Sequence, residues 1–363
     1  MLIDAHVHYY FPATPLKIKD ACKLTGALTC CLQSQIMRSR INQNIECLYA
    51  KALCGEKIYL NMALNAYYYE HHELMFKMPE YIERMLKCGF DGVKMIEGKP
   101  TDRKSFPIPD FDSPLYDDTF KYLEAHQIPI TWHVNDPEEF WDPERVPFWA
   151  KRSGWFYGDG TYANNEDQYR QIERLLEKHP KLVITFAHFY FLSGDLKRLG
   201  KLFDKFPNIG VDITPGIELF TNMSANIEEA RAFFNKYSDR ILYGTDISID
   251  SDAEGDLNVV DTITRKQLCH DFLTKDHFIL KGDEKGLLGK DDLELNGLCL
   301  DKEVVEKIEY HNFMKRYGKI RPLNYELIGK EIARYETELQ QSGRDTAFLK
   351  VIKQAFREKG ENA

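Results

Sequence analysis

The sequence predicts an α/β fold, a (β/α)8 TIM barrel that carries a C-terminal helical extension. Short apolar, β-branched runs alternate with longer segments of helical period over residues 1–250, which is typical of parallel strands joined by right-handed crossovers. Eight such units in about 250 residues match the usual length of this barrel. The turn after the first strand reads HVHYYFPATP and lacks the glycine-rich fingerprint of the rival dinucleotide-binding fold.

Eight segments carry the strand pattern. They span residues 2–8, 27–35, 57–65, 92–97, 128–134, 181–189, 208–215 and 240–248. Helical period is found between them at residues 38–53, 79–88, 114–126, 164–179, 194–206 and 227–237. Most of these strands follow a helix that ends near Gly, Pro, Asn or Asp, as short helix-to-strand connections favour. We therefore assign residues 1–250 to the barrel.

The remaining chain, residues 251–363, is polar and mostly helical in its pattern. Its long helix candidates are residues 302–317 and 325–360. We predict that this segment packs on the barrel as an extension of the same domain. Its charged end is expected to fray.

The composition is that of an ordinary globular protein, with 43% hydrophobic and 29% charged residues. No apolar run approaches the roughly 20 residues of a membrane helix. The formal charge of −9 repels polyanions. We therefore expect neither a membrane nor a nucleic acid as a partner.

The start, MLIDAHVHYY, lacks signal-peptide features, which favours the cytoplasm. The eight cysteines form no CxxC pair, so we expect free thiols.

The first predicted strand carries two imidazoles. Side chains at positions i and i+2 of a strand share one face, so Asp4, His6 and His8 are expected to project the same way. Two neighbouring imidazoles suggest a metal site. The ordinary alternative is a pair of histidines that hydrogen-bond to their neighbours on the surface or in the core.

Further reactive side chains lie near the ends of later strands, where the active sites of (β/α)8 barrels are built. They are Lys94, His133, His188 and Asp246. Each alone has an ordinary alternative, such as a core histidine, a helix cap or a rim charge. Together with the first strand they offer nitrogen and oxygen donors, which suit Zn²⁺, Mn²⁺ or Fe²⁺ and leave a position open for water.

These residues resemble a known family, the amidohydrolase superfamily, in the branch that includes the aminocarboxymuconate semialdehyde decarboxylases. The family's HxH motif on strand one, its histidines on strands five and six and its aspartate on strand eight are matched by His6, His8, His133, His188 and Asp246, the last within YGTD. The segment KIEYHNFMKRYG is similar to the final helix of that branch, whose asparagine falls at Asn312.

The resemblance implies a metal cofactor held by His6, His8, His133, His188 and Asp246. One divalent transition metal is expected, with zinc favoured over manganese or iron. A second metal is expected only if Lys94 or Glu97 on strand four bridges the two ions. Bound zinc lowers the pKa of its water from 15.7 towards about 7, which supplies hydroxide at neutral pH.

The resemblance also implies roles for two catalytic residues. Asp246 would take a proton from the water and deliver it to the leaving group, while His188 and the metal polarise a substrate carbonyl. We expect hydrolysis of an amide, lactone or related bond in a small carbonyl-containing substrate. Non-oxidative decarboxylation of an aromatic or unsaturated carboxylic acid is the alternative. A barrel that only binds a ligand is a lesser alternative, and it would predict a broken ligand set.

Substrate specificity is expected in the long segment 135–163 after strand five, because loops of that length in compact barrels are usually functional. It contains Trp141, Trp149 and Trp155 with Lys151 and Arg152, which could form an aromatic wall and an anion clamp, or only pin the loop to the barrel. The predicted contacts to a small-molecule substrate are Lys94, Arg152, Trp155 and Asp212, with Lys99 and Arg103 as weaker candidates. A homo-oligomer is compatible with the sequence.

Overall fold

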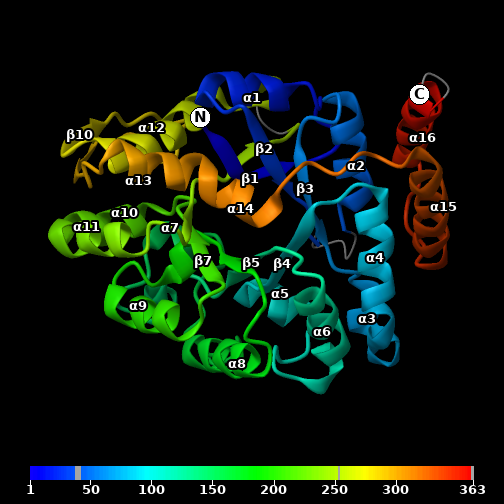
Figure 1. Ribbon diagram of the computed structural model, residues 1–363, viewed down its shortest axis with the longest axis horizontal. Helices are drawn as coiled ribbons and strands as arrows, with labels where there is room; N and C mark the ends of the chain where they lie inside the picture. Colours follow the sequence, from blue (N-terminus) through cyan, green and yellow to red (C-terminus); the bar gives the residue numbers. More distant parts are fainter. Residues whose placement is uncertain (37–41, 252–253, 361–363) are drawn as a thin grey trace.

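The computed structural model describes residues 1–36, 42–251 and 254–360 (Figure 1). Its main sheet is parallel throughout, and its strands follow one another in chain order around the sheet. They are β1 (Ile3–Tyr9), β2 (Thr29–Gln33), β3 (Tyr59–Ala63), β4 (Gly92–Gly98), β5 (Ile130–Val134), β6 (Ile184–Phe186), β7 (Ile209–Asp212), β8 (Ile241–Leu242) and β9 (Ile247–Ile249). Each lies within a predicted strand segment or within one residue of it, so the predicted α/β barrel is confirmed.

The barrel closes through an interrupted final strand. β8 pairs with β7, and β9 pairs with β1 with Val7 opposite Ile247. Between β8 and β9 the chain stays bonded to β1, because the Ala5 amide donates to the Tyr243 carbonyl at 2.9 Å and the Asp246 amide donates to the His6 carbonyl at 2.9 Å. The two short strands therefore act as one strand, the eighth of the barrel.

Helices surround the sheet where the helical period predicted them. They are α2 (Asn44–Leu53), α4 (Met78–Cys88), α6 (Asp117–Ala125), α8 (Asn165–Lys178), α9 (Leu196–Lys205) and α11 (Ile227–Lys236). The predicted helix 38–53 is confirmed over Asn44–Leu53, and its residues 38–41 lie outside the described residues. Not predicted were α1 (Lys17–Thr25), α3 (Tyr67–Glu70), α5 (Pro100–Ser105), α7 (Phe148–Arg152) and α10 (Ile217–Ala225).

Helix α9 shows why these segments fold as they do. The Asp195 side chain accepts a hydrogen bond from the Arg198 amide at 3.0 Å and so caps the first turn. Leu196, Leu199 and Phe203 recur at helical spacing and are buried against the core. The cap and the apolar stripe together define where the helix begins and which face it turns to the sheet.

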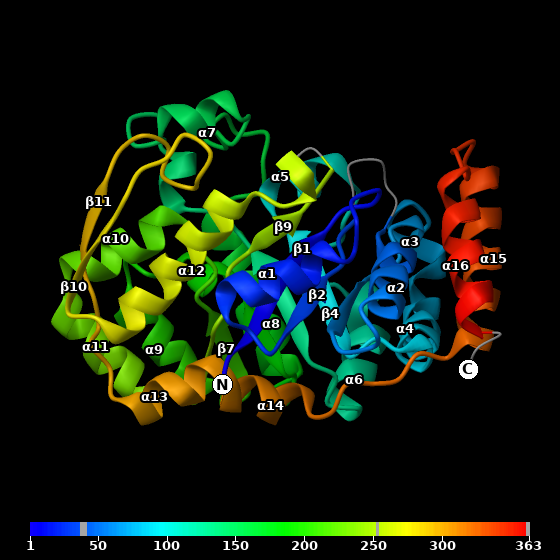
Figure 2. The same cartoon turned by 90° about the horizontal axis from the view of Figure 1, so that it is seen from above.

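The end of the barrel opposite the metal-ligand candidates is filled by the C-terminal extension. α14 (Asn312–Tyr317) brings the Tyr317 hydroxyl to the Asn61 side chain, whose nitrogen donates to it at 2.7 Å. Phe313 packs in a buried cluster with Ile3, Tyr59 and neighbouring side chains. In Figure 2, α13 (Lys302–Glu306) and α14 run along one end of the molecule, and α7 lies at the opposite end.

The extension differs from its prediction in two places. The predicted helix 302–317 is present, with a π-helical turn over Lys307–His311, but the predicted helix 325–360 is broken into α15 (Tyr325–Gln341) and α16 (Phe348–Gly360). Gly343 has a φ of 67°, a left-handed conformation that glycine adopts readily and that ends α15. A β-hairpin, β10 (His277–Leu280) and β11 (Leu293–Asn296), follows α12 (Val259–Thr274) and was not predicted.

α15 and α16 pack together beside α2 and α4 at one edge of the molecule in both views (Figures 1 and 2). Within the described parts of the chain, no helix has the length and apolar character needed to cross a membrane.

Candidate metal centre at the barrel mouth

Strand β1 holds His6 and His8 in defined orientations. Both imidazoles are buried. His6 Nδ1 lies 2.9 Å from Asp212 Oδ2 on β7, and His8 Nδ1 lies 3.1 Å from the Gln33 carbonyl oxygen. With the proton on Nδ1, His6 turns its Nε2 electron pair to the site, where Lys94 Nζ lies 3.1 Å away. His8 Nδ1 contacts Gln35 Nε2 at 2.8 Å as well as the Gln33 carbonyl.

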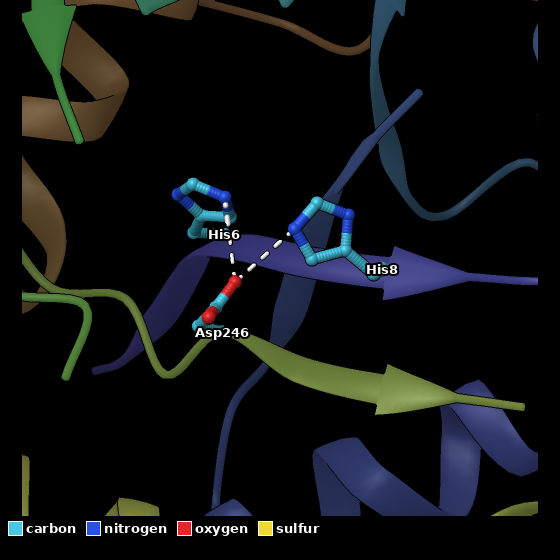
Figure 3. A group of neighbouring side chains, drawn as sticks. All are labelled: His6, His8 and Asp246. Atoms are coloured by element: carbon cyan, nitrogen blue, oxygen red, sulfur yellow. Dashed lines mark ion pairs between the residues drawn. The ribbon is translucent and has the colours of Figure 1, made fainter. Parts of the chain in front are cut away.

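The two Nε2 atoms face one carboxylate, that of Asp246 (Figure 3). Asp246 Oδ1 lies 3.1 Å from His8 Nε2 and 3.7 Å from His6 Nε2. Donor atoms of the three residues all fall within 4.8 Å of one another. Among the described residues they form the only group of three or more His, Cys, Asp and Glu side chains that meets this spacing. Asp246 is part-exposed, so the group opens towards solvent.

The electrostatics of the site keep the imidazoles of His6 and His188 neutral. Burial, reinforced by the nearby Lys94 charge, lowers the pKa of His6 to about 4. Burial and the neighbouring His133 lower the pKa of His188 to about 3. Neutral imidazole is the form that binds a metal. Burial opposes ionisation of Asp212, but the contact with His6 outweighs it and lowers the pKa of Asp212 to about 2.

His188 lies at the border of this group. Its ring centroid is 5.8 Å from that of His6 and 4.9 Å from that of His133. It begins a four-residue turn, His188–Phe191, in which every residue has a φ between 53° and 58°. Left-handed backbone costs about 1–2 kcal/mol per non-glycine residue, so this turn persists only because its surroundings hold it.

The left-handed turn is held by a hydrogen bond and by aromatic packing. The His188 amide donates to Asp212 Oδ1 at 2.9 Å. Phe189 stacks on Phe234 and Tyr190 on Phe186, with ring centroids 5.5 and 4.0 Å apart. Asp212, predicted as a substrate contact, therefore has both oxygens engaged in orienting His6 and the turn that carries His188.

His133 is turned towards a residue that sequence reasoning missed. Its Nε2 lies 3.1 Å from Asp136 Oδ1. The same carboxylate accepts hydrogen bonds from Lys99 Nζ at 3.2 Å and from the Tyr157 hydroxyl at 2.6 Å. The signal was an aspartate three residues after the strand-end histidine in HVND. His133 and His188 fall outside the group of three, and their role as metal ligands stays a prediction.

The two strand-four candidates diverge. Lys94 Nζ lies 3.1 Å from His6 Nε2, and burial lowers the pKa of Lys94 to about 8. Glu97 instead accepts a hydrogen bond from the Tyr69 hydroxyl at 2.7 Å, and burial raises the pKa of Glu97 to about 7. The structure therefore brings Lys94 to the site and directs Glu97 to a tyrosine.

The segment 135–163 folds over its own aromatic cluster, in which Phe140, Ala150 and Tyr157 are buried. Trp155 packs on this cluster, and Lys99 Nζ lies 4.9 Å from its ring centroid. Arg152 is exposed and lies over the Phe148 ring at 5.9 Å. Its role in substrate binding stays a prediction.

Two remaining features of the barrel mouth are the contacts of Arg103 and a small cavity. Arg103 donates to Gln171 and Asp110, as expected of a structural residue. A cavity of about 210 Å³ adjoins the site, and its lining includes His188, Phe191, Glu139 and Glu218. This volume is below the roughly 300 to 1,000 Å³ of usual ligand pockets.

Comparisons with known proteins give a family match and several matches in fold. A family model described as amidohydrolase matches residues 77–318. No curated protein matches the sequence significantly.

Solved structures share the fold at low sequence identity. An uncharacterised TIM-barrel protein from Bordetella bronchiseptica is 12% identical with a TM-score of 0.54, covering 88% of this chain and 99% of its own. A 2,6-dihydroxybenzoate decarboxylase is 13% identical with a TM-score of 0.52, covering 87% and 99%. A manganese-bound 5-carboxyvanillate decarboxylase from Novosphingobium aromaticivorans is 12% identical with a TM-score of 0.51, covering 88% and 97%.

Proposed function

Because the chain belongs to the amidohydrolase family, we propose that it is a metal-dependent hydrolase that cleaves an amide, lactone or related bond in a small carbonyl-containing substrate. One observation carries the proposal. His6 Nε2 and His8 Nε2 of β1 converge on Asp246 Oδ1, which lies between β8 and β9, near the end of the barrel where barrel enzymes place their reactive groups.

The donor set fits a single divalent transition metal. The two imidazoles of His6 and His8 and the carboxylate of Asp246 are donors that suit zinc, and both imidazoles are oriented by contacts at Nδ1 as metal-binding histidines usually are. We favour zinc, with manganese or iron as alternatives. A second metal would require a bridge from Lys94 or Glu97, of which Glu97 already accepts a hydrogen bond from Tyr69 at Oε1. When bound, the metal supplies Lewis-acid polarisation of a carbonyl and lowers the pKa of water at the site.

The chain's own residues supply the proton transfers. The part-exposed carboxylate of Asp246 can receive a proton from the attacking water. His188 borders the cavity and can donate a hydrogen bond to the oxygen on which charge develops. Lys94 is placed to hold a substrate oxygen next to His6, and Trp155 to order Lys99 at the mouth.

A decarboxylase is the second candidate function. Two of the structures that share the fold are decarboxylases of aromatic acids, and the same residues could protonate a carbon as carbon dioxide leaves. The convergence of His6, His8 and Asp246 favours an enzyme over a barrel that only binds a ligand.

Two measurements test the proposal. Elemental analysis of protein purified without chelators should give about one equivalent of metal per chain, and less than a tenth of an equivalent would contradict it. A screen of lactones, amides and aromatic or unsaturated carboxylic acids then identifies a substrate. Turnover in ¹⁸O-labelled water should place the label in the product, whereas carbon dioxide release with solvent deuterium entering carbon would assign the decarboxylase instead.

A further inference from the structure

The residue opposite the two imidazoles sits on an irregular piece of backbone. Asp246 has a φ of 57°, a conformation that costs a non-glycine residue about 1 kcal/mol or more. It follows Gly244, where a Cβ would approach Thr214 Cγ2 to 2.8 Å and His6 Cβ to 3.0 Å. No regular ladder spans Tyr243–Asp246, so other contacts must set the direction of the Asp246 side chain.

Strand β1 fixes this segment from one side. Asp4 accepts hydrogen bonds from the Thr245 amide at 3.0 Å and from its hydroxyl at 2.5 Å. The Asp246 amide donates to the His6 carbonyl. These bonds anchor the backbone of the segment, but they leave the carboxylate of Asp246 free to rotate.

Helix α12 fixes the same segment from the other side, and it belongs to the extension. It packs beside β9 (Figure 2). Cys269 Sγ donates to the Gly244 carbonyl at 3.4 Å. Arg265 Nη1 donates to the Thr245 carbonyl at 3.3 Å and lies 3.7 Å from Asp246 Oδ2. Arg265 is therefore the one side chain of α12 among these contacts that reaches the carboxylate itself.

We propose that Arg265 is a positioning residue that holds Asp246 Oδ2, so that Oδ1 faces His6 and His8 in a geometry ready for the metal. The inference rests on the proposed function, because it gives the C-terminal extension a part in the metal site. Arg265 acts through Asp246 and is itself no ligand.

The charge of Arg265 is compensated by Asp261, so Arg265 is expected to strengthen metal binding and not to weaken it. A lone guanidinium beside a metal site would repel a divalent cation. Arg265 Nε, however, donates to Asp261 Oδ2 at 2.7 Å on the same helix. The Arg265–Asp261 pair adds little net charge, so its ordering of Asp246 outweighs repulsion, and its loss should weaken metal binding.

The test compares Arg265→Gln and Arg265→Lys with the wild type. Zinc affinity is measured by competition with a chromophoric chelator, and the cobalt-substituted protein is followed by its visible absorption. Loss of a group that orients a ligand typically lowers metal affinity about 10- to 100-fold, and we expect this for Arg265→Gln with a weakened cobalt spectrum. The zinc affinity of Arg265→Lys should fall between those of the wild type and Arg265→Gln, because one ammonium group cannot span Asp261 and Asp246 as the guanidinium does.

Arg84→Gln is the matched control. Arg84 is also a part-buried arginine whose Nε donates to a carboxylate, that of Glu331, at 3.1 Å. It should lower the melting temperature as Arg265→Gln does and leave zinc affinity unchanged. Zinc affinity of Arg265→Gln within threefold of the wild type, with an unaltered cobalt spectrum, would overturn the inference.

A metal-free measurement separates this inference from the proposed function. Hydrogen exchange of the Asp246 amide in the apo protein should be faster in Arg265→Gln than in the wild type and in Arg84→Gln, because the segment loses the bond from Arg265 to the Thr245 carbonyl and keeps only that from Cys269 to the Gly244 carbonyl. Unchanged exchange would overturn the inference even in a protein that binds zinc. If the wild type binds no zinc while Arg265→Gln still exchanges faster than the wild type, only the proposed function is contradicted.

Discussion

On the β1 side of the barrel mouth, the imidazoles of His6 and His8 face the part-exposed carboxylate of Asp246, whereas on the β5 side the imidazole of His133 faces the buried carboxylate of Asp136. The two sides use the same residue types at similar distances. They differ in what else reaches the carboxylate.

The Asp136 carboxylate is buried, whereas the Asp246 carboxylate is partly exposed and has Arg265 at 3.7 Å besides the two imidazoles. His133, Lys99 and the Tyr157 hydroxyl all contact Asp136, and 5% of its side chain is exposed against 24% for Asp246. Burial opposes ionisation of Asp136, but Lys99 and the hydrogen bond with His133 hold its pKa well below the ordinary value. A buried carboxylate bonded to several side chains holds parts of the protein together, and a partly exposed carboxylate is available to a metal. We therefore expect mutations on the two sides to have different consequences.

The largest effect is expected from removing both imidazoles of β1. His6→Ala with His8→Ala should reduce bound metal from about one equivalent to less than a tenth, because only Asp246 of the group remains. The double variant His71→Ala with His72→Ala, which changes a histidine pair on the outside of the barrel, should keep its metal. Elemental analysis and circular dichroism check metal content and folding. Full metal content in the first variant would move the site to the β5 side.

The next effect in size concerns Asp246. Asp246→Asn keeps the size and one donor oxygen but removes the basic carboxylate, so metal should be partly retained while turnover falls about 10²- to 10⁴-fold. The rate is measured on a substrate from the screen, with metal content determined on the same sample. Turnover within a few-fold of the wild type in the metal-loaded variant would assign the proton transfer to another group, with His188 the next candidate.

The β1 side was the more predictable of the two. A period of two places His6 and His8 on one face, and the strand ends of a barrel meet at one rim, so local rules suffice. Asp246 was found by its position, but its left-handed backbone and its contact with Arg265 depend on packing between residues far apart in the chain. The strand and helix periods predicted the barrel for the same reason, since alternation is a local signal.

The features that were missed depend on tertiary contacts. Four consecutive non-glycine residues, HFYF, give no local sign of the left-handed turn His188–Phe191, which is imposed by aromatic packing and Asp212. The hairpin of β10 and β11 has two strands of four residues separated by a polar loop. Segments this short do not distinguish a strand pattern from a helical one. Asp136 lies in a loop, where no period operates.

A moderate effect on stability is expected from Asp136→Asn, with metal content unchanged. Removing the charge deprives Lys99 and Tyr157 of an ionised acceptor and should lower the free energy of unfolding at pH 7 by about 2 kcal/mol. Because the pKa of Asp136 is lower in the folded protein, its contribution is present above the unfolded value near 4 and is lost as the pH falls below it.

Denaturant unfolding at pH 7 and pH 3 checks this. The difference in the free energy of unfolding between wild type and Asp136→Asn should be smaller at pH 3 than at pH 7. Asp110→Asn, which changes an exposed partner of Arg103, should have little effect at either pH. A loss of metal in Asp136→Asn would show that the β5 side belongs to the metal site after all.

The smallest effect is expected in the segment 135–163 that follows β5, which we call the lid. Trp155→Ala removes the ring over which Lys99 Nζ lies at 4.9 Å, and an exposed contact of this kind contributes about 1 kcal/mol, which corresponds to about fivefold in affinity. If Lys99 helps to close the mouth over substrate, the Michaelis constant should rise by about that factor while metal content stays unchanged. Trp149→Ala is the matched control, because Trp149 belongs to the same aromatic cluster and packs on Trp155 and Phe140. Equal kinetics for Trp155→Ala, Trp149→Ala and the wild type would make the lid tryptophans purely structural, and a loss of metal in Trp155→Ala would erase the distinction between the two sides.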